Sequence, residues 1–194
     1  MSYMRIQDLL LPGASSPLSV VSQHADDTSL VVTSTDAIKT VFDTYDVFAS
    51  VSGSRLKQIK SKGLWLGSGS GRVNTPVRFD WTSGTLKIVR IFFGSGDLEE
   101  MNWRPRIVVV KNVLNSWRQR GLSFRGKALI VNALALARIW YIASLMHLPV
   151  WALRELASLV FVFFWKGKPD LVARKVVCQP TSLGGFGVVS IELK

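Results

Sequence analysis

Cysteine and histidine are scarce in this sequence, whose 194 residues include one cysteine, Cys178, and two histidines. A single cysteine cannot form an internal disulfide, and no group of Cys and His residues has the spacing of zinc ligands. We therefore expect an intracellular protein, located in the nucleus or the cytoplasm, that has no structural zinc site.

Long uncharged apolar runs are also absent. The most apolar region, residues 128–165, is interrupted by Arg138, Pro149 and Arg154. A helix that spans a membrane needs about 20 apolar residues without such interruptions. Residues 1–8 lack the basic segment followed by a long apolar run that marks a signal peptide. We expect a protein that is neither secreted nor transmembrane.

Acidic residues are few relative to basic ones. The chain has 24 Lys and Arg against 13 Asp and Glu, a formal net charge of +11, although only 19% of its residues are charged. Residues 1–98 hold ten basic and eight acidic residues, whereas residues 99–194 hold fourteen and five. This excess favours a polyanionic partner, with nucleic acid as the first candidate and an anionic membrane surface as the second.

Hydrophobic residues make up 48% of the chain, which is typical of a globular protein. Residues 1–98 contain short strand-like runs separated by Gly and Ser, whereas residues 99–194 have mostly helical periodicity. We therefore predict an α+β fold with two structural units, a mixed unit over residues 1–98 and a mainly helical unit over residues 99–194.

The first unit is predicted to begin with a β-hairpin. Short apolar runs at residues 18–21 and 30–32 flank the adjacent carboxylates Asp26 and Asp27, which then fall at the turn. The elements predicted after this hairpin are a helix over residues 35–53 and strands over residues 63–66 and 86–93.

The second unit is predicted to hold three helices. Pro105 suits the first turn of a helix that ends at Gly121, and Pro149 separates the two helices that follow. These later helices are predicted over residues 125–147 and 151–165, before a turn at residues 180–187.

The pair Asp26 and Asp27 has two explanations. Asp is common in turns because its side chain bonds to nearby backbone, and for the pair alone this is the simpler explanation. Two carboxylates at the tip of a hairpin also suit Mg²⁺, which prefers oxygen ligands and often binds one or two carboxylates together with substrate phosphates. That arrangement is typical of nucleotidyl transfer, in which two ions about 4 Å apart hold the attacking and leaving oxygens.

The context of the pair favours the metal site. HADDTSLVV is followed by SGSRLKQIKSKGLWLG, LKIVRIFFG, NWRPRI, SWRQRGLSFRGKALIVN, FFWKGK and QPTSLGGFGVVSIELK. In this order, and over nearly the whole chain, these segments resemble the reverse transcriptases of non-LTR (LINE-type) retrotransposons. The resemblance implies that residues 1–98 are the C-terminal part of a palm subdomain and residues 99–194 a basic, mainly helical thumb.

The resemblance implies catalytic roles for Asp26, Asp27 and Lys60. The two aspartates map onto the metal-binding hairpin, with Asp26 as the first candidate for a direct Mg²⁺ ligand. Lys60 maps onto a lysine near the phosphates of the incoming nucleotide, where an ammonium neutralises charge or donates a proton to pyrophosphate. The alternative explanation is a solvated lysine in a basic loop.

A second set of residues is implied to contact nucleic acid. His24 stands where the family has an aromatic residue beside the primer end. Residues 86–93 resemble the family's hairpin that grips the primer; the alternative is an ordinary sheet strand. In the thumb, cations alternate with tryptophans that are more simply core residues. The implied nucleic-acid-binding residues are His24, Arg104, Arg106, Arg118, Arg120, Arg125 and Lys127.

Three residues depart from the family pattern: His24 replaces Tyr or Phe, Lys57 replaces Asn and Arg90 replaces Gly. A side chain at position 90 is expected to obstruct a close approach of the backbone. The departures suggest a decayed or relaxed copy.

Several parts of the family's enzyme cannot be placed before His24: the aspartate of an earlier palm strand, the nucleotide-selecting helix, the fingers and the endonuclease. We therefore expect a fragment of an RNA-directed DNA polymerase, inactive alone and binding Mg²⁺ weakly or not at all. Its parent would use an RNA template, a DNA primer and deoxynucleoside triphosphates. The alternatives are a non-catalytic nucleic-acid-binding remnant and an unselected relic. We also expect self-association through exposed apolar surface, and no membrane partner.

Overall fold

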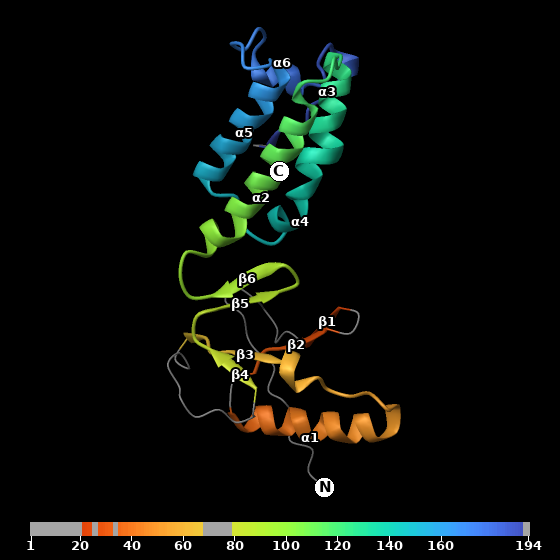
Figure 1. The fold of residues 1–194 in the computed structure, drawn as a ribbon, viewed down its shortest axis with the longest axis vertical. Helices are drawn as coiled ribbons and strands as arrows, with labels where there is room; N and C mark the ends of the chain where they lie inside the picture. The colour runs from red at the N-terminus through yellow and green to blue at the C-terminus, as the bar shows by residue number, and fades with distance from the viewer. Residues whose placement is uncertain (1–20, 25–26, 33–34, 68–78, 192–194) are drawn as a thin grey trace. The chain divides into compact units, whose positions relative to one another are not determined.

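The computed structural model describes residues 21–24, 27–32, 35–67 and 79–191. The chain forms two compact units, Met1–Gly96 and Asp97–Lys194, which are described separately (Figure 1). The described part of the first unit holds paired strands and one long helix, and that of the second unit is helical. The predicted α+β class is confirmed, whereas the assignment of the two units to palm and thumb stays a prediction.

The first unit begins with an antiparallel hairpin. Strand β1 (Val21–His24) pairs with β2 (Asp27–Leu30), and the last pair joins His24 to Asp27. Asp27 therefore belongs to a strand and not to the predicted turn. The second strand was expected at residues 30–32 and begins three residues earlier, at Asp27. The reason is that strands pair through backbone N–H and C=O groups, which polar residues have just as apolar ones do. Residues 18–20 of the predicted first strand lie outside the described residues.

Helix α1 (Thr35–Ser52) follows, as predicted. Gly53 ends it in the left-handed conformation, with φ +71°, and its N–H donates to the carbonyl of Ala49 at 3.0 Å. Glycine adopts this conformation without the steric cost that a Cβ brings. The end of α1 could be predicted because this signal is local.

Two short parallel strands come next in the first unit. Strand β3 (Lys62–Leu64) pairs with β4 (Asp80–Thr82). The predicted strand over residues 63–66 is thus present but ends two residues earlier. Asp80, which was expected in a turn-rich stretch, begins β4 and is exposed.

Stacked aromatic rings connect these strands. Trp81 lies directly over Gly63, where an added Cβ would come within 2.2 Å of the indole. The ring of Trp81 stacks with those of Trp65 and Phe79, at centroid distances of 4.4 and 5.2 Å. Phe79 in turn meets Phe42 of α1 at 5.8 Å. The glycine in β3 is therefore required by the packing of Trp81.

A second antiparallel hairpin completes the first unit. Strand β5 (Thr85–Ile88) pairs with β6 (Ile91–Gly94), and Val89 and Arg90 connect them with φ 43° and 68°. The apolar pattern predicted one strand over residues 86–93, and that prediction is wrong, although the family resemblance implies a hairpin here. The pattern misses the turn because neither connecting residue is of a turn-forming type.

Helix α2 (Leu98–Arg118) opens the second unit. Its N-terminal cap is Asp97, whose carboxylate accepts the N–H of Glu100 at 2.9 Å. Pro105 therefore lies inside the helix and not in the predicted first turn. A proline there has no N–H for the carbonyl of Met101, so the helix lacks one internal hydrogen bond. The cap and the buried residues of α2 hold its first turns despite this loss.

The helix predicted over residues 125–147 is not continuous. It consists of α3 (Phe124–Ile130), a π-helical turn (Val131–Ala135), a 3-10 turn (Leu136–Arg138) and α4 (Trp140–Ala143). Wide helical turns of this kind often accommodate a tertiary contact. Here the π-helical turn holds Asn132, whose side chain bonds to the C-terminal backbone.

Helix α5 (Val150–Phe164) starts after Pro149 and matches the third predicted helix within one residue at each end. A short helix, α6 (Arg174–Cys178), and a 3-10 turn (Thr181–Leu183) follow it. Helix α6 was not predicted, because five residues carry too little periodicity to be recognised.

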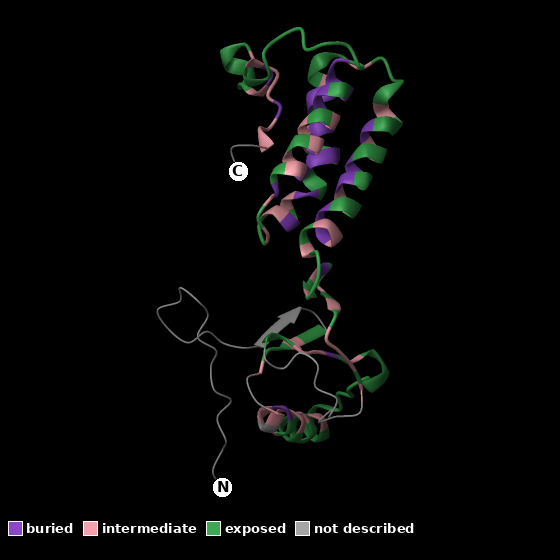
Figure 2. Ribbon diagram, turned by 90° about the vertical axis from the view of Figure 1, so that its left-hand side faces the viewer, coloured by how far each residue is buried: buried purple, intermediate pink, exposed green. Residues whose placement is uncertain are grey.

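The core of the second unit lies among α2, the segment from α3 to α4, and α5, which run side by side (Figure 1). Buried residues line the facing sides of these helices (Figure 2). Trp103 is completely buried, and its indole N–H donates to the carbonyl of His147 at 3.1 Å. Trp103 is therefore a core residue, which is the simpler of the two explanations given for the tryptophans. In the described ranges, no helix combines the length and the apolar character needed to cross a membrane.

Candidate nucleic-acid interface

The hairpin β1–β2 presents Asp27 beside the connection between its strands. Asp27 is the first residue of β2, is paired with His24 and is exposed. Asp26 and the side chain of His24 lie outside the described residues. The hairpin thus holds one of the two predicted metal ligands at its end, on the strand that leads toward α1.

A carboxylate in this position fits Mg²⁺ as one ligand, because Mg²⁺ prefers oxygen donors and keeps several waters. Across the described ranges, no group of three or more His, Cys, Asp or Glu side chains is arranged to hold a metal ion. The described residues therefore supply Asp27 but not a complete metal centre.

Lys60 ends a short 3-10 turn (Gln58–Lys60) between α1 and β3. Its N–H donates to the carbonyl of Lys57 at 2.9 Å, and its side chain is exposed. The hydroxyl of Ser61 donates to the same carbonyl at 3.1 Å. Lys57 supports this turn through its backbone oxygen, a group that any residue provides. The replacement of Asn by Lys therefore leaves the placement of Lys60 intact.

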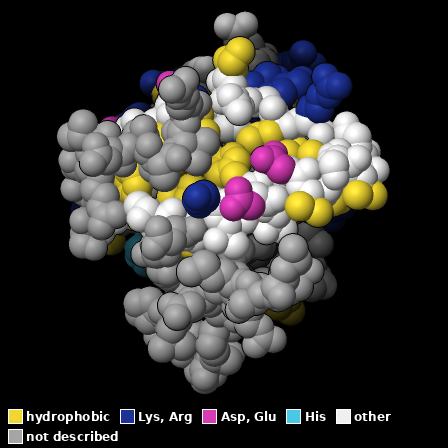
Figure 3. Space-filling model, turned by 90° about the horizontal axis from the view of Figure 1, so that it is seen from below, with side chains coloured by type: hydrophobic (Ala, Val, Ile, Leu, Met, Phe, Trp, Pro, Cys, Tyr) yellow, Lys and Arg dark blue, Asp and Glu magenta, His cyan; other side chains and the backbone are white. Residues whose placement is uncertain are grey.

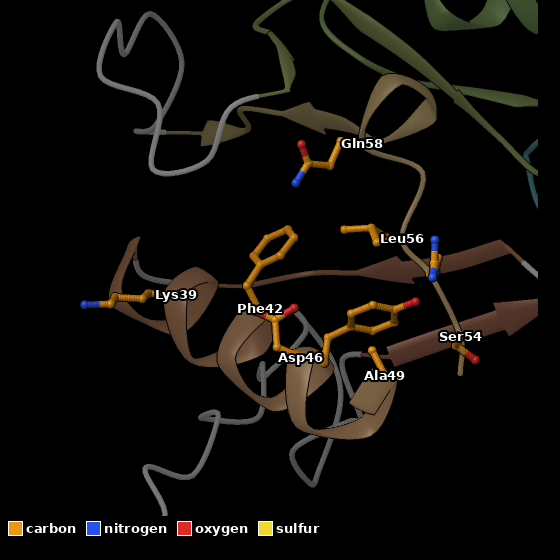
Figure 4. Close-up of a pocket in the computed structure, with 9 residues that line it drawn as sticks. Lys39, Phe42, Asp46, Ala49, Ser54, Leu56 and Gln58 are labelled. Atoms are coloured by element: carbon orange, nitrogen blue, oxygen red, sulfur yellow. The ribbon is translucent and has the colours of Figure 1, made fainter. Parts of the chain in front are cut away.

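A pocket of about 560 Å³ lies between α1 and residues 54–58. In Figure 4, Phe42 of α1 faces Leu56 and Gln58, whereas Lys39 points away from them. Neither Asp27 nor Lys60 lines this pocket. The structure therefore does not bring the two described catalytic candidates together in it.

Apolar side chains are exposed on α1. Val47, Phe48 and Val51 have exposed fractions of 68%, 57% and 87%. Figure 3 looks at the molecule from below and shows hydrophobic side chains at the surface beside acidic ones. Self-association through such a surface stays a prediction.

Arg104 connects two helices of the second unit. Its guanidinium donates to Glu100 at 2.6 Å and to Glu155 at 2.7 Å, and it lies over the ring of Trp151 at 4.6 Å. The hydrogen bond to Glu100 contributes most to raising the pKa of Arg104 above its ordinary value. With two carboxylates balancing its charge, Arg104 fits a contact between α2 and α5 better than a contact with phosphate. Arg106, on the same helix, is half-buried.

Lys127 is buried, with 7% of its surface exposed. Its ammonium donates to the carbonyl of Phe164 at the end of α5 and lies 5.0 Å from the centre of the Phe124 ring. Burial lowers the pKa of Lys127, and the charge of Lys166 lowers it further. A buried ammonium that binds a carbonyl is less available to a phosphate than the exposed cations are, and the contact of Lys127 with nucleic acid stays a prediction.

Exposed cations gather at one end of the second unit, and we call five of them the basic end. Figure 1 shows that the C-terminal ends of α2 and α5 and the start of α3 lie together there. An added Cβ on Gly167 would lie 3.1 Å from the guanidinium of Arg118, so the ends of α2 and α5 adjoin. The basic end consists of Arg118, Arg120, Arg125, Lys166 and Lys168.

Lys166 and Lys168 were not among the predicted site residues. The signal for them is present in the sequence, since the segment FFWKGK places two lysines directly after an apolar helix. What the sequence does not show is their nearness to Arg118, because α2 and α5 are more than thirty residues apart along the chain.

The recorded ion pairs of the second unit involve other cations. Glu100 and Glu155 bind Arg104, and Asp170 binds Arg174 at 2.8 Å. The guanidinium of Arg120 lies over the ring of Trp117 at 4.1 Å, a cation–π contact that leaves its charge in place. Among the described residues, no cation of the basic end forms one of these ion pairs, so this end keeps positive charge of the kind that a phosphate backbone attracts.

No protein-family model matches the chain. A protein of Xenopus laevis described as "Transposon TX1 uncharacterized 149 kDa protein" is 28% identical to it over 178 residues. The match covers 89% of this chain but only 14% of the Xenopus protein. The chain is therefore similar, along most of its length, to a small segment of a transposon protein, which supports a transposon origin.

Proposed function

We propose that this chain is the palm and thumb portion of a LINE-type reverse transcriptase, in which the helical unit binds the duplex of template and primer. The support is the order of the parts: a hairpin with adjacent carboxylates, a long helix, a second hairpin and a basic helical unit. The similarity to a transposon protein runs through most of the same residues.

The observation that carries the binding function is the basic end. Five exposed cations come from two stretches of the chain, residues 118–125 and 166–168, that the folded unit brings together. Cations so placed bind the phosphates of a duplex without reading its sequence, and they release the counterions that the duplex holds. The expected ligand is therefore an RNA–DNA hybrid or another duplex, bound with little sequence preference.

In the parent enzyme, Asp26 and Asp27 would hold Mg²⁺ at the end of the β1–β2 hairpin. The ion would stabilise the negative charge that develops on the transferred phosphoryl group. Lys60, exposed on the turn after α1, would lie near the phosphates of the incoming nucleotide. These roles are proposals that rest on the resemblance of the hairpin and of the segment SGSRLKQIKSKG.

The test is the salt dependence of binding by the full chain to a labelled RNA–DNA hybrid. Log affinity should fall linearly with log salt concentration, with a slope of about 0.9 for each phosphate that is neutralised. Replacing Arg118, Arg120 and Arg125 together by Ala should lower that slope by about two to three. Binding that ignores salt would contradict the proposal.

A matched control removes the same amount of charge elsewhere in the second unit. Lys111, Arg138 and Arg154 are exposed on helices outside the basic end. Their joint replacement by Ala should leave most of the slope in place. Equal losses in the two triple variants would mean that net charge, and not the basic end, determines binding.

A second candidate function is a nucleic-acid-binding module without catalysis. It is favoured by the location of the basic end in the second unit, whereas Asp27 and Lys60 belong to the first. Both candidates predict the same salt dependence. They differ in whether Asp26→Ala abolishes primer extension in a longer chain that includes the rest of the palm.

A further inference from the structure

The link between α2 and α3 carries a serine preceded by two arginines. Residues 118–124 read RQRGLSF, with Arg120 three positions and Arg118 five positions before Ser123. Among the serines and threonines of the chain, Ser123 alone has arginine at both of these positions. Guanidinium groups beside a serine offer planar, bidentate donors that the carboxylates of an arginine-directed kinase can bind.

The structure leaves this serine accessible. Ser123 is exposed, and residues 119–123 form an irregular link in which only Leu122 is half-buried. Gly121 has open space around it, with no atom within 4 Å of an added Cβ. The hydroxyl oxygen accepts the N–H of Gly126 at 3.2 Å, a single weak bond that a modified side chain can give up.

A kinase needs an extended segment around the serine, which here means opening the last turn of α2 and the cap that Ser123 forms on α3. Residues 119–123 are not helical, and Arg118 is the last residue of α2. Fraying of the final turn of α2 frees Arg118, and Arg120 must also leave the ring of Trp117, over which it lies at 4.1 Å. The core residues of α2, such as Leu114, lie before this turn and stay buried.

We propose that Ser123 is a phosphorylation site for an arginine-directed serine kinase. In this step the Oγ of Ser123 attacks the γ-phosphorus of magnesium-bound ATP. The bond from that phosphorus to the bridging oxygen breaks and ADP leaves, while the hydroxyl proton passes to a carboxylate of the kinase. The product is a phosphoserine in the middle of the basic end.

The phosphate changes the charge where the chain is proposed to bind nucleic acid, so this consequence rests on the proposed function. A phosphoserine carries about −1.5 to −2 charges at neutral pH. Arg120 and Arg125 lie within three residues of Ser123, and Arg118 lies on the adjoining turn. The modification therefore offsets about two of the five cations and acts as a switch that releases the duplex.

The first experiment measures phosphate incorporation. The full chain is incubated with a purified arginine-directed serine kinase and magnesium ATP, and the modified residue is located by mass spectrometry. Incorporation at Ser123 is expected, with at least a tenfold loss of rate on Arg120→Gln. Absence of phosphate on Ser123, or equal labelling of Arg120→Gln, would overturn the proposal.

Two serine variants separate modification from folding. Ser123→Asn removes the hydroxyl but keeps a side-chain oxygen that caps α3, so this variant should fold and stay unlabelled. Ser116→Ala is the matched control, because Ser116 is exposed on α2 but has Val113 three positions before it. Ser116→Ala should be labelled as the unmodified chain is, and a loss of label there would overturn the assignment to Ser123.

The second experiment measures the effect on binding. The phosphorylated chain should bind the RNA–DNA hybrid roughly tenfold more weakly at low salt, with the salt slope lowered by about two. An unchanged slope would overturn the switch. If the unmodified chain does not bind the hybrid at all, the proposed function fails, while the mass spectrum still decides whether Ser123 is modified.

Discussion

Val89 and Arg90 form the tip of the β5–β6 hairpin with positive φ values at both positions. Two-residue connections of this type favour Asn and Gly, because other residues bring Cβ close to the backbone in the left-handed region. The backbone conformation at the tip of this hairpin is therefore unfavourable for the two residues that occupy it. A hydrogen bond at the other end of the hairpin stabilises it: the hydroxyl of Ser95 donates to the carbonyl of Ser83 at 2.9 Å.

Replacing Arg90 by Gly should stabilise the chain. The substitution removes the steric cost of a left-handed non-glycine residue, about 1 kcal/mol, which the thermal or chemical denaturation midpoint reports. The control is Arg154→Gly in the interior of α5, which should destabilise by about 1 kcal/mol because glycine weakens a helix. A less stable Arg90→Gly chain would mean that contacts of the Arg90 side chain outweigh the strain.

Lys127 should make the stability of the fold depend on pH. Burial and Lys166 lower its pKa in the folded chain, whereas the unfolded chain keeps a value of about 10.4. Between the folded and the unfolded pKa, the unfolded chain binds more protons, so stability rises with pH across that window. Replacing Lys127 by Met removes this dependence.

The measurement is chemical denaturation of both chains from neutral pH to about pH 10. The free energy of unfolding of the unmodified chain, relative to Lys127→Met, should increase as the pH rises. A difference that stays constant or decreases with pH would show that Lys127 is not buried as an ammonium beside Phe164.

Asn132 connects two elements of the second unit. Its amide nitrogen donates to the carbonyl of Gly187 at 2.8 Å, and the N–H of Val189 donates to its oxygen at 3.0 Å. One side chain thus pairs with the C-terminal backbone as a neighbouring strand would. Gly185 lets the chain reach this position, because an added Cβ there would lie 2.1 Å from the carbonyl of Gln179.

Replacing Asn132 by Leu should detach the C-terminal segment from the π-helical turn. Both hydrogen bonds are lost, and the free energy of unfolding should fall by about 1 to 3 kcal/mol. Amide exchange at Val189 should become faster in the same variant. The exposed residue Asn115 on α2 is the control, and Asn115→Leu should leave exchange at Val189 unchanged.

The helices differ in how well local signals describe them. α1 and α5 match their predicted ranges because Gly53 and Pro149 act on the backbone of the residues beside them. α2 begins seven residues before Pro105, because the cap at Asp97 and the buried side of the helix outweigh the missing proline bond. A proline marks the start of a helix only when no N-cap residue, such as Asp97 here, begins the helix further upstream.

At the scale of the whole molecule, the chain should have no polymerase activity by itself. Two divalent ions and a triphosphate need a third carboxylate besides Asp26 and Asp27, since adjacent residues on one hairpin cannot surround both ions. The other described aspartates of the first unit belong to different elements: Asp43 and Asp46 are exposed on α1, and Asp80 begins β4.

Primer extension on an RNA template with the purified 194-residue chain is the measurement. No extension is expected, and Asp26→Ala should change nothing. In a longer chain that includes the rest of the proposed palm, the same substitution should abolish synthesis, because the bound metal would supply most of the charge stabilisation. Magnesium-dependent extension by the 194-residue chain, lost on Asp26→Ala, would mean that another carboxylate completes the site.

The candidate site could be predicted in part. The segment HADDTSLVV indicated the hairpin, and the charge of residues 99–194 indicated a basic surface in the helical unit. Arg118, Arg120 and Arg125 of the basic end were among the predicted residues, whereas Lys166 and Lys168 were not. Arg104 and Lys127 are basic like Arg118 and Arg125, yet the first two are engaged by other residues of the unit.

The sequence by itself determined the ends of α1 and α5 and the excess of positive charge, because helix periodicity, terminating residues and composition are local or additive properties. Only the tertiary structure decided where that charge is available. Phe164 of α5 engages Lys127, Glu155 engages Arg104, and Lys166 comes to lie at the same end of the unit as Arg118. The physical reason is that burial and pairing of a charge depend on neighbours from distant parts of the chain, and no local pattern carries that information.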